Sequence, residues 1–259
     1  MLVGDDRFSL PEGVTLGDGV LSDAVRGASW PVNPGGVYVL GRAGDPLAAI
    51  ARGLAATYRI DAERAAADVA SFVAGLNSLL LLNVTTPRRW RSWLALAVRL
   101  APLRTLPAPR ARRVPLGRRR LRTTAAALAP HALLLGLAVA APLLAVGLLA
   151  AVPAAALGSA AGGGLVLHEA AHVVALRRRP SALVLCGWTV FVLHAPLRGA
   201  RRALVALSGP LAASAAGVLL VAAAAAADAP TAALAGALLT THALGATVAA
   251  RDGRAACGL

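Results

Sequence analysis

The chain has 259 residues, of which 58% are hydrophobic and only 15% are charged, and its mean hydropathy is +0.68. Soluble globular domains are typically about 45–50% apolar and about 25% charged, so this composition indicates a membrane protein. Intrinsic disorder is excluded for residues 81–259, because most of them are aliphatic. The net charge of +14 is unevenly distributed, because residues 1–80 carry net −3 and residues 81–259 carry net +17. The two cysteines make no disulfide framework or metal-cluster spacing, and the acidic first twenty residues do not resemble a signal peptide.

Residues 1–86 are predicted to form a small soluble α+β domain with a winged-helix-like order of elements. Short β-like runs occur at Gly19–Leu21 and Val37–Leu40. The turn residues of Asn33–Gly36 favour a hairpin or a wing between strands.

Two helices are predicted in the second half of this domain. The first runs from Pro46 to Tyr58, with Asp45 as its cap and a proline at the first helical position. The second follows Asp61, another capping residue. Apolar residues recur on one face of this second helix: Ala65, Val69, Phe72, Val73 and Leu76.

The order of these segments resembles a known peptide-binding domain. The stretches Pro31–Asn33, Tyr58–Asp61 and Asp68–Leu76 are similar to the peptide chaperone of pyrroloquinoline-quinone biosynthesis, a recognition element for ribosomally made, modified peptides. The resemblance implies that a precursor peptide docks as an added β-strand beside a helix. The net charge of −3 argues against a nucleic-acid partner.

Residues 87–123 form an arginine-rich segment with twelve arginines and no acidic residue. An amphipathic helix is predicted from about Trp90 to Leu103, followed by a linker broken by prolines. Arginines next to an apolar run are typical of the cytoplasmic side of a membrane, where each contributes about 1 kcal/mol to binding anionic lipid. We therefore expect anionic lipid, and not nucleic acid, to contact this segment.

Residues 124–259 predict a mainly α, polytopic membrane domain with about four transmembrane helices. A bilayer core of about 30 Å needs about 20 apolar residues. Four segments approach this length: Thr124–Leu149, Ala154–Leu176, Ala203–Ala227 and Thr231–Ala250. The arginines before the first segment, between the second and third, and after the fourth predict a plasma-membrane protein with a cytoplasmic N-terminal domain.

The motif His168-Glu169-Ala170-Ala171-His172 lies inside the second apolar segment. Residues four apart share a helix face, so the imidazoles of His168 and His172 can bind one Zn²⁺. Glu169 is then placed to accept a proton from a water that the metal acidifies. An ionisable residue in an apolar span is by default a functional candidate.

Two histidines leave a zinc site one protein ligand short. Asp252 is favoured as the third ligand, because it ends the fourth segment on the same side of the membrane as the end of the second. His131 remains an alternative ligand, and His194 is a candidate for substrate contact. His242 lies about ten residues, nearly three helical turns, before Asp252, which is expected to place it deep on the fourth helix and out of range of the metal.

The apolar half resembles the site-2 protease family of intramembrane metalloproteases. The resemblance rests on the His168–His172 motif, the Ala206–Ala212 segment with Gly209 and Pro210, and Asp252-Gly253. It implies that His168, His172 and Asp252 bind Zn²⁺, that Glu169 is the general base, and that the β-rich run Ser181–Pro196 helps hold an extended substrate. Gly209, Pro210, His194 and His242 are substrate-contact candidates. The family commonly has Asn and Pro where this chain has Leu244 and Thr247.

Together these features predict a zinc metalloendopeptidase in the membrane, made of residues 1–86, a linker at 87–123 and a protease domain at 124–259. Its expected substrate is a precursor peptide of a modified-peptide pathway or another membrane protein, cut from the cytoplasmic side. Two alternatives are a membrane adaptor that binds peptide without cutting it, and a metal or small-solute transporter. The oligomeric state is not predicted.

Overall fold

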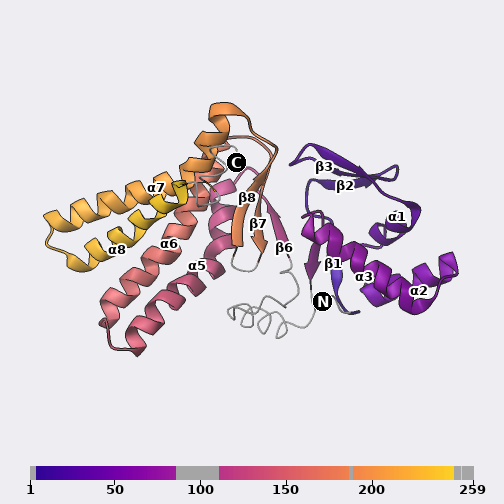
Figure 1. Ribbon diagram of the computed structural model, residues 1–259, viewed down its shortest axis with the longest axis horizontal. Coiled ribbons are helices and arrows are strands. Elements are labelled where there is room, and N and C mark those ends of the chain that lie inside the picture. The colour runs from indigo at the N-terminus through magenta and orange to yellow at the C-terminus, as the bar shows by residue number, and fades with distance from the viewer. Residues whose placement is uncertain (1–3, 86–110, 187–188, 248–251, 253–259) are drawn as a thin grey trace. The chain divides into compact units, whose positions relative to one another are not determined.

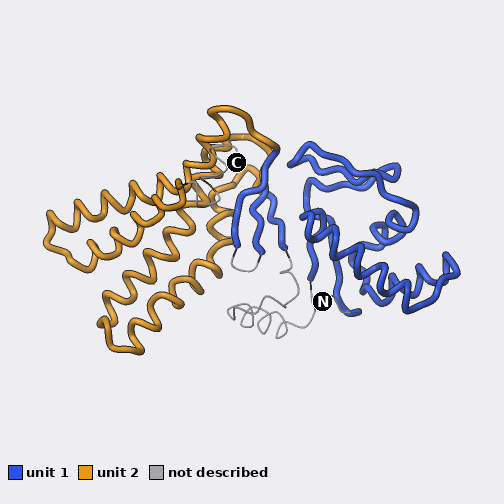
Figure 2. Tube along the Cα trace, viewed as in Figure 1, with its two compact units in different colours: residues 1–115, 182–195 blue, residues 116–181, 196–259 orange. Residues whose placement is uncertain are grey.

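The computed structural model describes residues 4–85, 111–186, 189–247 and 252. The chain divides into two compact units, which are described separately (Figure 2). The first unit comprises residues 1–115 and 182–195, and the second comprises residues 116–181 and 196–259. The helix predicted at Trp90–Leu103 lies outside the described residues.

The N-terminal part of the first unit contains two small antiparallel sheets (Figure 1). One is a three-stranded meander in the order β2-β3-β4, and the other pairs the first strand with the fifth. The strands are β1 (Arg7–Ser9), β2 (Val14–Gly17), β3 (Val20–Asp23), β4 (Ala28–Pro31) and β5 (Asn83–Thr85).

Three helices complete this domain: α1 (Pro34–Leu40), α2 (Leu47–Tyr58) and α3 (Ala62–Ser78). The predicted cap of α3 is confirmed, because the Asp61 carboxylate accepts hydrogen bonds from the backbone N–H groups of Glu63 and Arg64. The predicted apolar face of α3 is also confirmed. Its residues join a core that contains Phe8, Leu21, Ile50, Ala65, Val69, Val73, Leu81 and Leu82.

Three local predictions in this domain are wrong. The segment Val37–Leu40 is helical, because Asn33 caps α1 by accepting a hydrogen bond from Gly36 N–H, and Pro34 takes the first helical position. The turn predicted at Asn33–Gly36 is therefore a helix start. At α2, Pro46 occupies the cap position and no side chain caps the helix, so Asp45 does not serve as predicted.

A third sheet, in the order β6-β7-β8, joins residues from the arginine-rich segment to the predicted β-rich run. Its strands are β6 (Ala111–Pro115), β7 (Ser181–Cys186) and β8 (Thr189–His194). The β-rich run is confirmed, whereas β6 was not predicted. Two asparagine side chains bond the backbone of β6: Asn77 pairs with Ala111 at 2.9 and 3.2 Å, and Asn83 pairs with Arg113 at 3.0 and 2.7 Å.

A buried ion pair also holds β6 to the N-terminal domain. The guanidinium of Arg113 donates two hydrogen bonds, of 2.8 and 2.7 Å, to the carboxylate of Asp23 on β3. Both side chains are at most 1% exposed. Burial alone would raise the pKa of Asp23, but hydrogen bonds from Arg113 and Arg26 lower it to about 2.

We predict that Arg113→Met destabilises the β3–β6 contact by about 3–5 kcal/mol, because it leaves a buried carboxylate short of its main partner. Hydrogen–deuterium exchange of the full chain should show faster exchange in β3 and β6. The control is Arg112→Met, since the neighbouring Arg112 is exposed.

The ion pair of Asp23 and Arg113 also makes the free energy of unfolding depend on pH. A carboxylate with a lowered folded-state pKa stabilises the fold above its unfolded pKa, so this contribution should fade as the pH falls from about 4 to about 2. The loss of stability over this pH range should be smaller in Arg113→Met than in the unmodified chain. Equal acid sensitivity in both proteins would contradict this assignment.

The second unit is a helical bundle made of α5 (Arg120–Ala145), α6 (Ala151–Ala175), α7 (Gly199–Ala226), α8 (Pro230–Thr240) and the 3₁₀ helix η1 (Thr241–Ala246). Three of these helices, α5, α6 and α7, are long and apolar enough to cross a membrane. The helices approach closely where small residues meet. A Cβ atom on Gly158 would lie 2.6 Å from the Gly136 carbonyl oxygen, so α5 and α6 touch backbone to backbone.

The fourth predicted span is not confirmed. Within the described residues, α8 has 11 residues and then tightens into η1. After η1, Thr247 adopts an extended conformation, with φ −78° and ψ 156°. The single straight helix expected from Thr231 to Ala250 is therefore interrupted well before Asp252.

Candidate metal centre

The His168–His172 motif lies in the last two turns of α6. Glu169 and His172 are both buried, at 5% and 8% exposure, and His168 is half-buried beside them. One helical turn separates the two histidines. The planes of their imidazoles make an angle of 77° with each other, and the ring centroids are 4.9 Å apart. The helix thus presents two ring nitrogens to one point.

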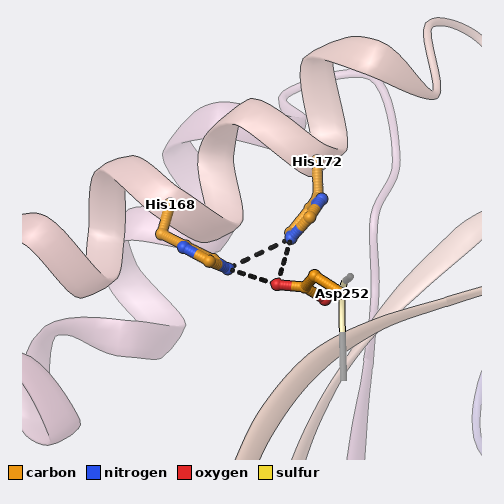
Figure 3. Close-up of side chains that lie close together, drawn as sticks. All are labelled: His168, His172 and Asp252. Carbon is orange, nitrogen blue, oxygen red and sulfur yellow. Dashed lines mark hydrogen bonds and ion pairs between the residues drawn. The ribbon is translucent and has the colours of Figure 1, made fainter. Parts of the chain in front are cut away.

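Asp252 comes from a distant part of the chain and completes a triangle of ligand atoms (Figure 3). Its Oδ2 lies 3.1 Å from Nε2 of His168 and 3.6 Å from Nε2 of His172, and the two Nε2 atoms are 3.2 Å apart. Tetrahedral Zn²⁺ with ligands at about 2.0–2.1 Å requires ligand atoms about 3.3 Å from one another. The three atoms therefore match the size of a zinc site.

The hydrogen bonds of His172 favour the tautomer that binds a metal. Its Nδ1 lies 2.6 Å from the carbonyl oxygen of Val205 on α7. A carbonyl can only accept, so Nδ1 carries the proton and the Nε2 of a neutral ring presents a lone pair. Metal-binding histidines typically show this arrangement. The hydroxyl of Ser208 also donates to the Val205 carbonyl, at 2.7 Å.

His168 has a different partner on its far side. Its Nδ1 lies 3.3 Å from Nδ1 of His242, which is on η1, and the ring centroids are 5.4 Å apart. If His168 uses Nε2 for a metal, its Nδ1–H donates to the lone pair of His242 Nδ1. His242 thus stands where metal-binding histidines commonly have a carboxylate or a carbonyl.

Without a cation these groups would be poorly matched. His172 Nε2 and the Asp252 carboxylate are both acceptors, and they face each other at 3.6 Å. The donor set of two imidazoles and one carboxylate is that of known catalytic zinc sites.

Gly209 on α7 leaves room for the two imidazoles. A Cβ atom at this position would overlap Nε2 of His172 and would lie 2.8 Å from two atoms of the His168 ring. Gly209 is thus placed against the ligands, and neighbouring Pro210 is buried on α7 beside Gly245. Their predicted contact with substrate stays a prediction.

The remaining candidates lie outside this cluster. In the described part of the chain, the residues close enough to share a metal ion are His168, His172 and Asp252, so the alternative ligand His131 on α5 is not among them. His194 ends β8, where its Nδ1 donates to the Ala195 carbonyl at 2.7 Å. Its proposed substrate contact also stays a prediction.

The sequence interpretation missed the role of His242. It treated residues up to Asp252 as one helix, in which ten residues span about 15 Å. Because α8 ends at Thr240 and Thr247 is extended, that spacing does not apply, and His242 and Asp252 both reach His168. The Val205 carbonyl was also missed, since no side chain marks it in the sequence.

Comparison with known proteins supports the resemblance predicted for the N-terminal domain. Residues 18–82, about a quarter of the chain, match the family model described as coenzyme PQQ synthesis protein D (PqqD). This match confirms the resemblance to the peptide chaperone of pyrroloquinoline-quinone biosynthesis. No curated protein and no solved structure gave a significant match. The resemblance of the bundle to site-2 proteases stays a prediction.

We predict that the purified full chain retains about one Zn²⁺, and that His172→Ala and Asp252→Asn reduce this to a small fraction, since each removes one of three protein ligands. Elemental analysis of protein in detergent measures the stoichiometry. The matched controls are His131→Ala and His194→Ala, which should retain the metal. Equal metal content in all five proteins would contradict the site.

We further predict that His242→Ala weakens zinc affinity about 10–100-fold, the usual effect of removing a partner of a ligand histidine. His242→Gln retains a side-chain oxygen that can accept from His168 Nδ1–H, and should recover part of the affinity. Competition with a zinc chelator measures both variants. If His242→Ala binds zinc as tightly as the unmodified chain, His242 does not orient His168.

Proposed function

We propose that this chain is a membrane-embedded zinc metallopeptidase that hydrolyses a peptide bond in a precursor peptide. The observation that supports it most is the triangle of His168, His172 and Asp252 atoms next to a buried glutamate on the same helix. A metal-binding histidine pair enclosing a glutamate one residue after the first histidine is typical of metalloproteases.

Zn²⁺ held by these three residues would polarise the scissile carbonyl and acidify a water molecule. Glu169 would accept a proton from water on one of its carboxylate oxygens while the water oxygen attacks the carbonyl carbon. It then delivers the proton to the nitrogen of the leaving amine as the C–N bond breaks. The Val205 carbonyl would keep His172 in the required tautomer, and a lone pair on His242 Nδ1 would do the same for His168.

The N-terminal domain is the proposed peptide-recognition module. It contains a cavity of about 530 Å³ between α1, α2 and α3, which lies within the residues that match PqqD. Apolar side chains dominate its lining, including Val39, Leu54, Ile60 and Phe72, and polar groups such as Arg64 and Asp68 flank them. Such a lining suits an apolar side chain of a bound peptide.

An edge strand offers a second means of binding. The sheet order β2-β3-β4 leaves β4 at one edge, where an extended peptide can add as a further strand. Backbone hydrogen bonds would then supply affinity, and the cavity would supply side-chain specificity. Recognition by this domain and cleavage in the bundle together favour leader-peptide removal as the reaction.

We predict that Glu169→Gln abolishes cleavage while zinc is retained, because the variant keeps the three ligands and loses the proton acceptor. Removal of a general base typically slows such reactions about 10²–10⁴-fold. The experiment uses the full chain in nanodiscs, a peptide library from a digested proteome, and mass spectrometry of new N-termini.

Asp228→Asn is the matched control, since it makes the same carboxylate-to-amide change in the turn after α7. This variant should cleave normally. Identical sets of new N-termini from Glu169→Gln and the unmodified chain would show that the bundle is not the peptidase. Peptide binding with no zinc-dependent cleavage would favour the non-catalytic adaptor instead.

A further inference from the structure

A cavity lined by arginines lies at one end of the helical hairpin formed by α5 and α6. It has a volume of about 560 Å³ and is separate from the metal centre. Five arginines and three apolar residues line it: Arg118, Arg119, Arg120, Arg122, Arg177, Leu121, Val173 and Val174. We call it the arginine cavity.

The charges of the arginine cavity are unbalanced. Among the residues that the structure describes, none of the five guanidinium groups forms an ion pair with a carboxylate. The cavity also adjoins the N-terminus of α5, whose first turn holds no acidic residue and whose cap position, Arg119, makes no side-chain cap. A helix N-terminus carries a partial positive charge of about +0.5, so the four arginines at the start of α5 oppose its dipole, whereas Arg177 lies after the C-terminus of α6, where a positive charge is favourable. An anion bound here would relieve both sources of repulsion.

The backbone at Arg177 is held in an unfavourable conformation. Arg177 follows the end of α6 with φ +54°, in the left-handed region where glycine is usually found. The Arg120 side chain donates a hydrogen bond to the Arg177 carbonyl, which fixes the turn against the start of α5. The turn thereby keeps the fifth arginine at the cavity, where a glycine would contribute no charge.

Exposed apolar residues beside the arginines favour a lipid over a soluble anion as the ligand of the arginine cavity. Leu121 is 52% exposed and Val174 is 59% exposed, and both line the cavity. The helices that carry them are long and apolar enough to cross a bilayer, so their ends are suited to the depth of lipid headgroups. In an anionic phospholipid the headgroup phosphate can contact the arginines while the acyl chains contact Leu121 and Val174.

We propose that the arginine cavity binds the headgroup phosphate of an anionic phospholipid. Guanidinium groups from the start of α5 and the end of α6 would donate paired hydrogen bonds to the phosphate oxygens, and the acyl chains would lie along Leu121 and Val174. The lipid would thus bridge the start of α5 and the end of α6, the helix that carries the metal-binding motif. This proposal does not depend on peptidase activity.

The test compares two double variants with the same change in net charge. Arg122→Gln with Arg177→Gln removes two arginines of the cavity and leaves Arg120, which stabilises the turn. Arg178→Gln with Arg179→Gln is the matched control, because these exposed arginines directly follow Arg177 in the chain but do not line the cavity. The full chain in detergent is titrated with phosphatidylglycerol or phosphatidylcholine, and native mass spectrometry counts the bound lipids.

We expect the unmodified chain to bind one phosphatidylglycerol in preference to phosphatidylcholine. The cavity variant should bind it at least about tenfold more weakly, whereas the control should stay within about twofold. Equal weakening in both variants would overturn the proposal, since it would show diffuse attraction to the whole basic loop. Displacement of the lipid by millimolar inorganic phosphate, or stronger saturable binding of a short single-stranded RNA, would also overturn it.

Discussion

The cost of placing ionisable side chains in an apolar helix governs the arrangement of the bundle. A charged group at the centre of a bilayer costs a few kcal/mol or more unless a partner compensates for it. Within five residues, α6 carries two histidines and a glutamate. The bundle meets this cost by bringing Asp252, the Val205 carbonyl and His242 to the same end of α6. These groups come from three different segments, so they fix how the helices fit together as well as which nitrogen atoms face the centre.

The sequence predicted the local parts of the site better than the distant ones. His168 and His172 could be predicted because residues four apart on a helix share one face, whatever the surrounding fold. His242 could not be placed, because its position depends on where α8 ends and on the 3₁₀ turn that follows. Asp252 was favoured from the predicted membrane topology and then from a resemblance, and no local pattern links it to α6.

In the N-terminal domain, too, some elements could not be predicted from the sequence alone. At α1 two signals conflicted: Val37 and Val39 favour a strand, whereas Asn33 followed by Pro34 is a typical helix start. The capping bond from Gly36 N–H to Asn33 decides in favour of the helix. Strand β6 was missed for a different reason, because it is stabilised by β7 and by Asn77 and Asn83, which lie far away in the sequence.

Arginines that look equivalent in the sequence therefore have different physical roles. Arg113 is buried and neutralises Asp23, whereas its neighbour Arg112 is exposed. A positive-inside interpretation treats both alike, since it counts charges and ignores burial. The strand explains the difference, because successive residues of β6 point to opposite faces and only one face meets the N-terminal domain. A basic segment next to an apolar one can thus be a topological signal and a structural element at once.

Glycine is the residue that lets the polar centre form in so apolar a bundle. The imidazoles of α6 fit against α7 because Gly209 has no side chain, and α6 itself packs on α5 through Gly136 and Gly158. On the other side, Gly217 of α7 and Gly236 of α8 are in backbone contact, which holds the helix that leads to His242. Ligand atoms about 3.3 Å apart tolerate little movement, so close backbone packing is what keeps the triangle of nitrogen and oxygen atoms small enough for one ion. The small residues of these long apolar helices thus also set the precision of the candidate metal centre.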